Sequence, residues 1–178
     1  DLMDLGAVDR IYRHANSSVA LTPYHSATVQ FKGIPSREDR MVEVVIPNGV
    51  DVGIFEDALQ SRQDRDRDDG KLRLVWTSNP NRGLPTAVRI FRRLVARWPQ
   101  LEFHVYGRAA VYGWDAGHEA AWLPDPDEPW VFVHDPLPKH KLAEALCDAW
   151  AMFYPSHWAE TSSIACLEGQ CAGIPIIT

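Results

Sequence analysis

The stretch that decides the fold lies at the end of the chain, where residues 150–178 read WAMFYPSHWAETSSIACLEGQCAGIPIIT. Residues 150–154 form a short apolar run that predicts a buried strand, and residues 174–177 form a second, β-branched run. Between them, residues 161–172 are typical of a helix. This succession of strand, helix and strand is the repeating unit of a parallel α/β sheet.

The same alternation continues upstream of this stretch. Pro85 suits the first turn of one expected helix, and Pro99 ends that helix. We expect strands at residues 72–76, 101–106 and 130–134, and helices at residues 84–98 and 138–147. Short apolar strands alternating with amphipathic helices predict the α/β class, with a doubly wound, parallel, Rossmann-like sheet.

The first part of the chain has a different character. Residues 2–14 have helical spacing, and residues 18–22 and 41–46 are extended runs. A turn follows at residues 47–49, where Gly49 is expected to supply a backbone angle that other residues avoid.

These patterns predict the domain organisation. We expect the tail of an N-terminal domain and a crossing segment at residues 1–60, a linker rich in arginine and aspartate at 61–71, and the sheet domain at 72–178. Because the chain stops at a strand with no helix after it, we expect a fragment that is incomplete at both ends.

Composition narrows the classes of function. The net charge is −6 and no basic stripe is present, so nucleic acid is not expected as a partner. Three cysteines, an odd number, favour reduced thiols and a cytoplasmic protein, and no signal peptide or long apolar run is present. No glycine-rich motif for binding a dinucleotide or for a phosphate loop occurs. No pair of histidines has the spacing of a zinc site, so no metal site is expected.

Two glutamates in the deciding stretch are the best candidates for chemistry. Glu160 precedes the expected helix, whose first turn offers free N–H groups for a diphosphate, and Glu168 lies about 10 Å further along it at 1.5 Å per residue. One carboxylate can then bind a sugar ring and the other a ribose, because carboxylates accept hydrogen bonds from paired hydroxyls. Spacing alone favours a simpler interpretation, in which Glu160 is a capping acid and Glu168 a solvated helix residue, because acids are common at helix starts.

A resemblance to a known family favours the first interpretation. The two glutamates, separated by seven residues and followed by Ala172-Gly173-Ile174-Pro175, resemble the Glu-x7-Glu motif of the family 4 retaining glycosyltransferases of the GT-B fold. The similarity is mainly to the C-terminal, donor-binding domain of that family. Three further stretches match in the expected order: Val45–Asp51, Ser78–Leu84 and Val105–Gly107.

The resemblance implies roles for individual residues. Glu160 would contact the donor sugar and Glu168 the ribose, while Arg82 would stabilise the leaving diphosphate. The N–H groups of Thr161, Ser162 and Ser163 would hold the diphosphate, and Val133 and His134 would border the base. Two positions depart from the family pattern: Thr161-Ser162 stands where Phe-Gly is common, and Trp76 stands where a second basic residue is frequent.

The implied function is transfer of a sugar from a nucleoside-diphosphate sugar, such as a UDP- or GDP-sugar, with retention of configuration. The resemblance implies no metal and no other cofactor. The acceptor would be a glycan, a lipid or a protein, and it would bind the N-terminal domain. The same domain could also associate peripherally with a membrane. This chain alone would bind nucleotide without turnover. Two alternatives remain: a sugar-nucleotide epimerase of the same fold, and a non-catalytic module that binds nucleotide sugars.

Overall fold

The computed structural model describes residues 17–23, 42–63, 69–108, 113, 117, 120–158 and 160–178. The chain divides into two compact units. Unit 1 comprises Asp1–Gly49 together with Ala159–Ser163, and unit 2 comprises Val50–Trp158 together with Ile164–Thr178. Each unit is described by itself.

Unit 2 contains a five-stranded sheet in which every neighbouring pair of strands is parallel. The strands are β3 (Leu72–Trp76), β4 (Leu101–Val105), β5 (Val131–Val133), β6 (Ala151–Phe153) and β7 (Ile176–Ile177), in the spatial order β5-β4-β3-β6-β7. The chain builds outward from β3 to β5 and then returns to place β6 and β7 on the other side of β3. The predicted α/β class with a parallel sheet is confirmed, and the switch point lies between β3 and β6.

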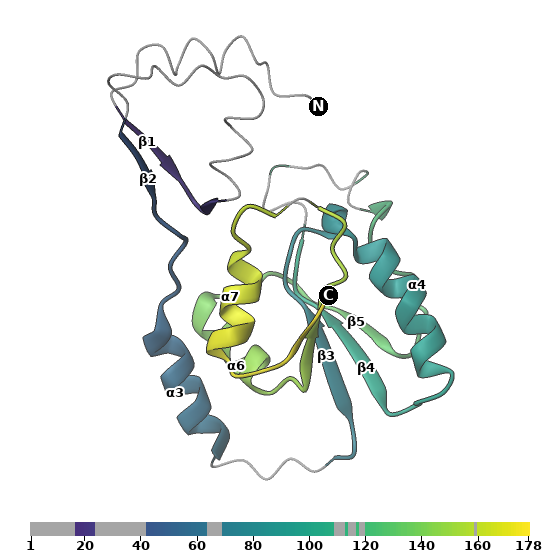
Figure 1. Cartoon of the computed structure of the whole chain (residues 1–178). Helices are drawn as coiled ribbons and strands as arrows, with labels where there is room; N and C mark the ends of the chain where they lie inside the picture. Colours follow the sequence, from purple (N-terminus) through teal and green to yellow (C-terminus); the bar gives the residue numbers. More distant parts are fainter. Residues whose placement is uncertain are drawn as a thin grey trace. The chain divides into compact units, whose positions relative to one another are not determined.

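Helices cover both faces of this sheet (Figure 1). On one face lies α4 (Leu84–Val95), and on the other lie α6 (Lys139–Cys147) and α7 (Ile164–Cys171). The 3-10 turn η1 (Pro80–Arg82) connects β3 to α4. All of these lie within residue ranges predicted to be helical, apart from η1, although α7 begins three residues later than the predicted residue 161.

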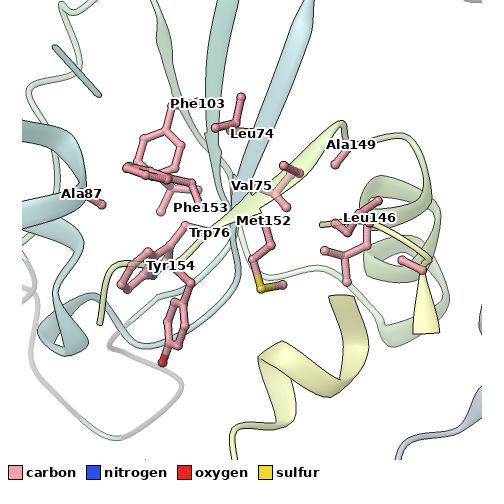
Figure 2. Close-up of a cluster of buried hydrophobic side chains, with 14 of the residues drawn as sticks. Leu74, Val75, Trp76, Ala87, Phe103, Leu146, Ala149, Met152, Phe153 and Tyr154 are labelled. Carbon is pink, nitrogen blue, oxygen red and sulfur yellow. The ribbon is translucent and has the colours of Figure 1, made fainter. Parts of the chain in front are cut away.

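The core has one layer on each side of the strands. On the α4 side, Phe91 stacks on Phe103 with ring centroids 4.8 Å apart and on Trp130 at 5.3 Å. On the other side, Met152 packs against α7, where Gly169 leaves room for the Met152 methyl group. Figure 2 shows Phe103 and Phe153 on one side of the strands and Met152 and Leu146 on the other.

Helix α3 (Val52–Gln63) belongs to unit 2 and was not predicted from the sequence. It packs along α6, and Phe55 and Ala58 are buried in the same core as the sheet. Asp51 caps it, since its Oδ1 accepts a hydrogen bond from the Gly53 N–H at 3.1 Å. The sequence placed residues 52–60 with the crossing segment, whereas the structure packs them on the sheet unit. The remainder of the predicted division into domains stays a prediction.

In unit 1, β1 (Ser17–Ala20) pairs in parallel with β2 (Val42–Val45), from Ser17 opposite Val42 to Ala20 opposite Val45. The Ile46 N–H continues the pairing by donating to Ala20 O at 2.9 Å. Both extended runs are therefore confirmed, while the expected helix at residues 2–14 lies outside the described residues. The expectation for Gly49 was wrong, because its φ is not positive.

Within the described part of the chain, no helix combines the length and the apolar character needed to cross a membrane.

Gly107 gives a direct test of how the sheet is packed. A Cβ atom at this position would lie 1.7 Å from Ser78 O, so Gly107→Ala must displace backbone. We expect the free energy of unfolding in urea to fall by about 3 kcal/mol, the upper range for overpacking. Gly53→Ala is the control, since its Cβ would make only an ordinary 3.4 Å contact. Equal stability of the two variants would contradict this packing.

Candidate functional site

The carboxyl ends of β3, β4 and β6 meet at Ser78, which is 6% exposed. Its carbonyl oxygen accepts a hydrogen bond from Trp76 Nε1 at 2.7 Å, and its hydroxyl accepts one from the Tyr154 hydroxyl at 3.1 Å. Gly107, directly after β4, lies against its backbone. Trp76 is therefore a fully buried core residue, and it contributes no polar group to a diphosphate contact. In open parallel sheets, ligands bind at this edge.

The loop after β3 packs against the loop after β6. Asn79 Oδ1 accepts a hydrogen bond from the Asn81 N–H at 3.1 Å and so shapes the turn η1. Gly83 has φ of +129°, and a Cβ there would lie 3.0 Å from Pro155 O and 3.2 Å from His157 Nδ1. Only glycine allows this backbone angle and this close approach together. The two loops that border the switch point therefore form one continuous surface.

Arg82 lies on that surface as the last residue of η1, two positions before α4 begins. Its Cζ is 5.9 Å from the centroid of the Trp158 ring, and Trp158 is 51% exposed. This cation–π contact joins η1 to the loop after β6, and the first turn of α4, which begins two residues after Arg82, contains no acidic residue. A helix start already attracts anions, so a cation there favours a negatively charged ligand.

Glu168 is buried, which contradicts the alternative of a solvated helix residue. Its side chain is 7% exposed and accepts a hydrogen bond from Lys139 Nζ in an ion pair. Because α7 begins at Ile164, Glu168 is its fifth residue, about 6 Å from the helix start at 1.5 Å per residue. The expected distance of about 10 Å along the helix was therefore too long, because the helix starts later than residue 161.

Lys139 was not foreseen from the sequence. It is the first residue of α6, and its side chain is 67% exposed. The first turn of α6 also contains His140 and Lys141 but no acidic residue, although cations are unfavourable at a helix N-terminus. That mismatch is the signal that could have pointed to a buried acid nearby.

The structure groups Glu160, Thr161, Ser162 and Ser163 with unit 1, and Glu168 with unit 2. Within unit 1, Asn48 Nδ2 donates a hydrogen bond to Ser162 O at 2.9 Å. The three hydroxyl residues precede α7, so the prediction that they form its first turn was wrong. Whether their N–H groups bind a diphosphate stays a prediction.

Val133 and His134 lie at the carboxyl end of β5. The His134 ring stacks on Tyr106 with centroids 4.4 Å apart, and its Nε2 lies 2.9 Å from Nδ1 of His104. Phe132 stacks on the other end of this group, 4.8 Å from His104. The resemblance implies that Val133 and His134 border the base, which stays a prediction, and the ring stack was not predicted.

Burial lowers the pKa of His104 below its ordinary value, and the nearby His134 lowers it further, while the hydrogen bond to Glu102 opposes both. Burial also lowers the pKa of His134. Both imidazoles are therefore held in the neutral form that allows one ring to donate to the other.

Among the residues that the structure describes, no three histidine, cysteine, aspartate or glutamate side chains come close enough together to hold a metal ion.

Comparison with known proteins places this geometry in context. No protein-family model and no curated protein matches the sequence. Solved structures do match. Sucrose-phosphate synthase from Thermosynechococcus elongatus has a TM-score of 0.68 at 17% identity, covering 99% of this chain and 43% of its own. The chain has a GT-B type fold.

Two further solved structures have a similar fold. The UDP-forming α,α-trehalose-phosphate synthase from Burkholderia vietnamiensis has a TM-score of 0.67 at 13% identity, covering 94% of this chain and 45% of its own. HepE from Anabaena, solved with UDP and glucose, has a TM-score of 0.66 at 17% identity, covering 97% and 46%. The chain thus spans less than half the length of these GT-B proteins.

The lowered pKa of His104 predicts how the stability of unit 2 depends on pH. The unfolded chain binds a proton on this residue more readily than the folded chain does, so the free energy of unfolding should decrease as the pH falls from 7.5 to 5. His104→Phe keeps the ring stacking but removes the titrating group, so the free energy of unfolding should decrease less as the pH falls. The difference should be a fraction of the ~1.4 kcal/mol per pH unit that corresponds to one full proton. Urea unfolding at several pH values measures it.

The control is His140→Gln, which changes an exposed histidine on α6. If this variant flattens the pH dependence as much as His104→Phe does, the ring stack is not its source.

Proposed function

We propose that the chain binds a nucleoside-diphosphate sugar and forms the donor-binding part of a retaining glycosyltransferase. The observation that carries the proposal is Glu168, a carboxylate with 7% exposure on the helix after β6, held by a lysine at the carboxyl edge of the GT-B sheet. Burial of a charged group is costly, and a solvent-facing helix position would avoid it. A ligand with paired hydroxyl donors, such as ribose, can donate hydrogen bonds to this carboxylate.

Arg82 is the group proposed to assist the reaction itself. When the bond between sugar and diphosphate breaks, negative charge develops on the leaving diphosphate. A guanidinium fixed in advance by the Trp158 ring stabilises that charge without having to reorient. We propose no metal in this step, because Arg82 and the positive ends of the helix dipoles supply the positive potential.

The other residues take the roles that the family resemblance implies. In this proposal Glu160 binds hydroxyls of the donor sugar, and the N–H groups of Thr161, Ser162 and Ser163 bind the diphosphate. Val133 and His134 border the base. The trehalose-phosphate synthase forms UDP and HepE was solved with UDP, which makes UDP the first nucleotide to test and GDP and ADP the next.

The acceptor is proposed to be a glycan, lipid or protein bound by a part of the enzyme outside this chain. A lipid acceptor would bring the enzyme to a membrane surface. None of the three cysteines, all in the described part of the chain, forms a disulfide. That state fits the cytoplasmic location we propose.

One observation favours a second candidate, a module that binds nucleotide sugars without turnover. Trp76 is fully buried where the resembling family often has a basic residue, so this position supplies no second cation to the diphosphate. An assay of sugar transfer by the full-length protein separates the two candidates. Binding without transfer or hydrolysis would favour the module.

The first functional prediction concerns Glu168. We expect UDP or a UDP-sugar at about one hundred times its dissociation constant to stabilise the chain by about 2.7 kcal/mol, and so to raise its Tm by several degrees. Glu168→Gln should weaken binding about tenfold, because a carboxylate accepts stronger hydrogen bonds than an amide. Calorimetric titration measures the affinity.

Glu144→Gln is the matched control, since Glu144 lies on α6 and pairs with Lys141 near the surface. If UDP, GDP, ADP and their sugars all leave the Tm of the folded chain unchanged, the proposed function is wrong.

The second functional prediction concerns Arg82. Arg82→Met should weaken UDP binding by about ten- to one-hundredfold and leave uridine binding unchanged, because the guanidinium is proposed to contact only the diphosphate. Arg89→Met, at an exposed position of α4, should change neither affinity. Equal losses for UDP and uridine would instead assign Arg82 a structural role.

A further inference from the structure

The ion pair between Lys139 and Glu168 joins α6 to α7, and the two residues are 29 positions apart in the chain. Its two ends are unequal, because the Lys139 side chain is 67% exposed whereas the Glu168 side chain is 7% exposed. The ammonium therefore keeps most of its hydration, and the carboxylate has lost most of its own. The lysine thus compensates the burial of the acid while giving up little solvation itself.

The position of Lys139 is unfavourable for its own helix. It occupies the first residue of α6, where the helix dipole disfavours a positive charge. Lys141, in the same turn, pairs locally with Glu144, at 2.9 Å from Oε1 and 3.0 Å from Oε2. Lys139 instead pairs across to α7, so the interaction with Glu168 is what accounts for its placement.

The geometry of the pair leaves part of the carboxylate available. Lys139 Nζ donates to Oε1 of Glu168, and no described residue donates to Oε2. Apolar residues can often replace a buried ion pair without loss of stability, so stability alone does not require this pair. Here one oxygen is paired with a mostly solvated cation, and the other has no donor in the part of the chain that the structure describes.

We propose that Lys139 is a positioning residue, which holds the Glu168 carboxylate oriented so that Oε2 accepts a hydrogen bond from the nucleotide ribose. This inference rests on the proposed function, and it assigns to Lys139 the selection of a ribonucleotide over its 2′-deoxy form. Loss of Lys139 leaves Glu168 on its helix but releases its side chain from the orientation that the ribose requires.

The experiment compares UDP with 2′-deoxy-UDP by calorimetric titration of the whole 178-residue chain. The native chain is expected to bind UDP on the order of tenfold more tightly than 2′-deoxy-UDP, the effect of one charge-assisted hydrogen bond. In Lys139→Met, binding of UDP weakens toward that of 2′-deoxy-UDP, and the preference largely disappears. Lys139→Arg restores the preference, because a guanidinium can make the same pair.

Lys141→Met is the matched control on the same helix and keeps the native preference. Lys139→Gln provides a second uncharged variant, and melting of each protein without nucleotide shows that it is folded. If Lys139→Met and Lys139→Gln keep the full preference for UDP, the inference is overturned while the proposed function stands. If they weaken both nucleotides equally, Lys139 has only a structural role, which also overturns it.

A different result bears on the proposed function itself. If the folded native chain binds neither UDP, GDP nor ADP, the proposed function fails and the role of Lys139 fails with it. If GDP or ADP binds in place of UDP, the same comparison is made with that nucleotide and its 2′-deoxy form.

Discussion

The contact between Gly107 and Ser78 is the constraint on which the candidate site depends. Because Gly107 has no side chain, the end of β4 can lie directly against the Ser78 backbone, while Trp76 and Tyr154 hold Ser78 from β3 and from the end of β6. Three strand ends are thereby fixed in one small region. The loops that continue from them, with Gly83 against Pro155, inherit their positions from this contact. Arg82 and Trp158 are placed by those loops.

Three charged side chains in this region occupy positions that are electrostatically unfavourable for the stability of the fold. Lys139 is at the start of a helix and Glu168 is buried, while Arg82 lies close to the start of another helix. Each placement costs free energy in the unliganded protein unless another charge compensates it. Lys139 and Glu168 compensate each other, and the Trp158 ring partly compensates Arg82. Such arrangements concentrate at binding sites, because preorganised charges favour the ligand that completes them.

The strands and most helices of unit 2 could be predicted because their apolar residues repeat with a clear period, as in residues 72–76 and 84–95. Helix α3 could not, because it buries only Phe55 and Ala58 and the rest of it is polar or partly exposed. Gly49 follows an asparagine in a turn, which favours a positive φ that the backbone does not adopt. Lys139 was not predicted for another reason. The cations at the start of α6 indicate an acid nearby, but they do not identify it, because Glu168 is distant in sequence and only folding brings α6 and α7 together.

The motif that supports the family resemblance contains two kinds of information. Gly173, with φ of +70°, ends α7 in a left-handed conformation, its N–H donates to Gln170 O, and the Ile174 N–H donates to Gly169 O. These two bonds satisfy carbonyl groups at the helix end, and Pro175 prevents continuation, so this half of the motif follows from helix capping alone. Any protein that turns from a helix into a parallel strand here has a use for it. Glu168 has no such explanation, because a buried acid does nothing for the helix. The capping half therefore carries information about the fold alone, as does a structural likeness at 13–17% identity, whereas the argument for a nucleotide sugar must rest on the acid and its lysine.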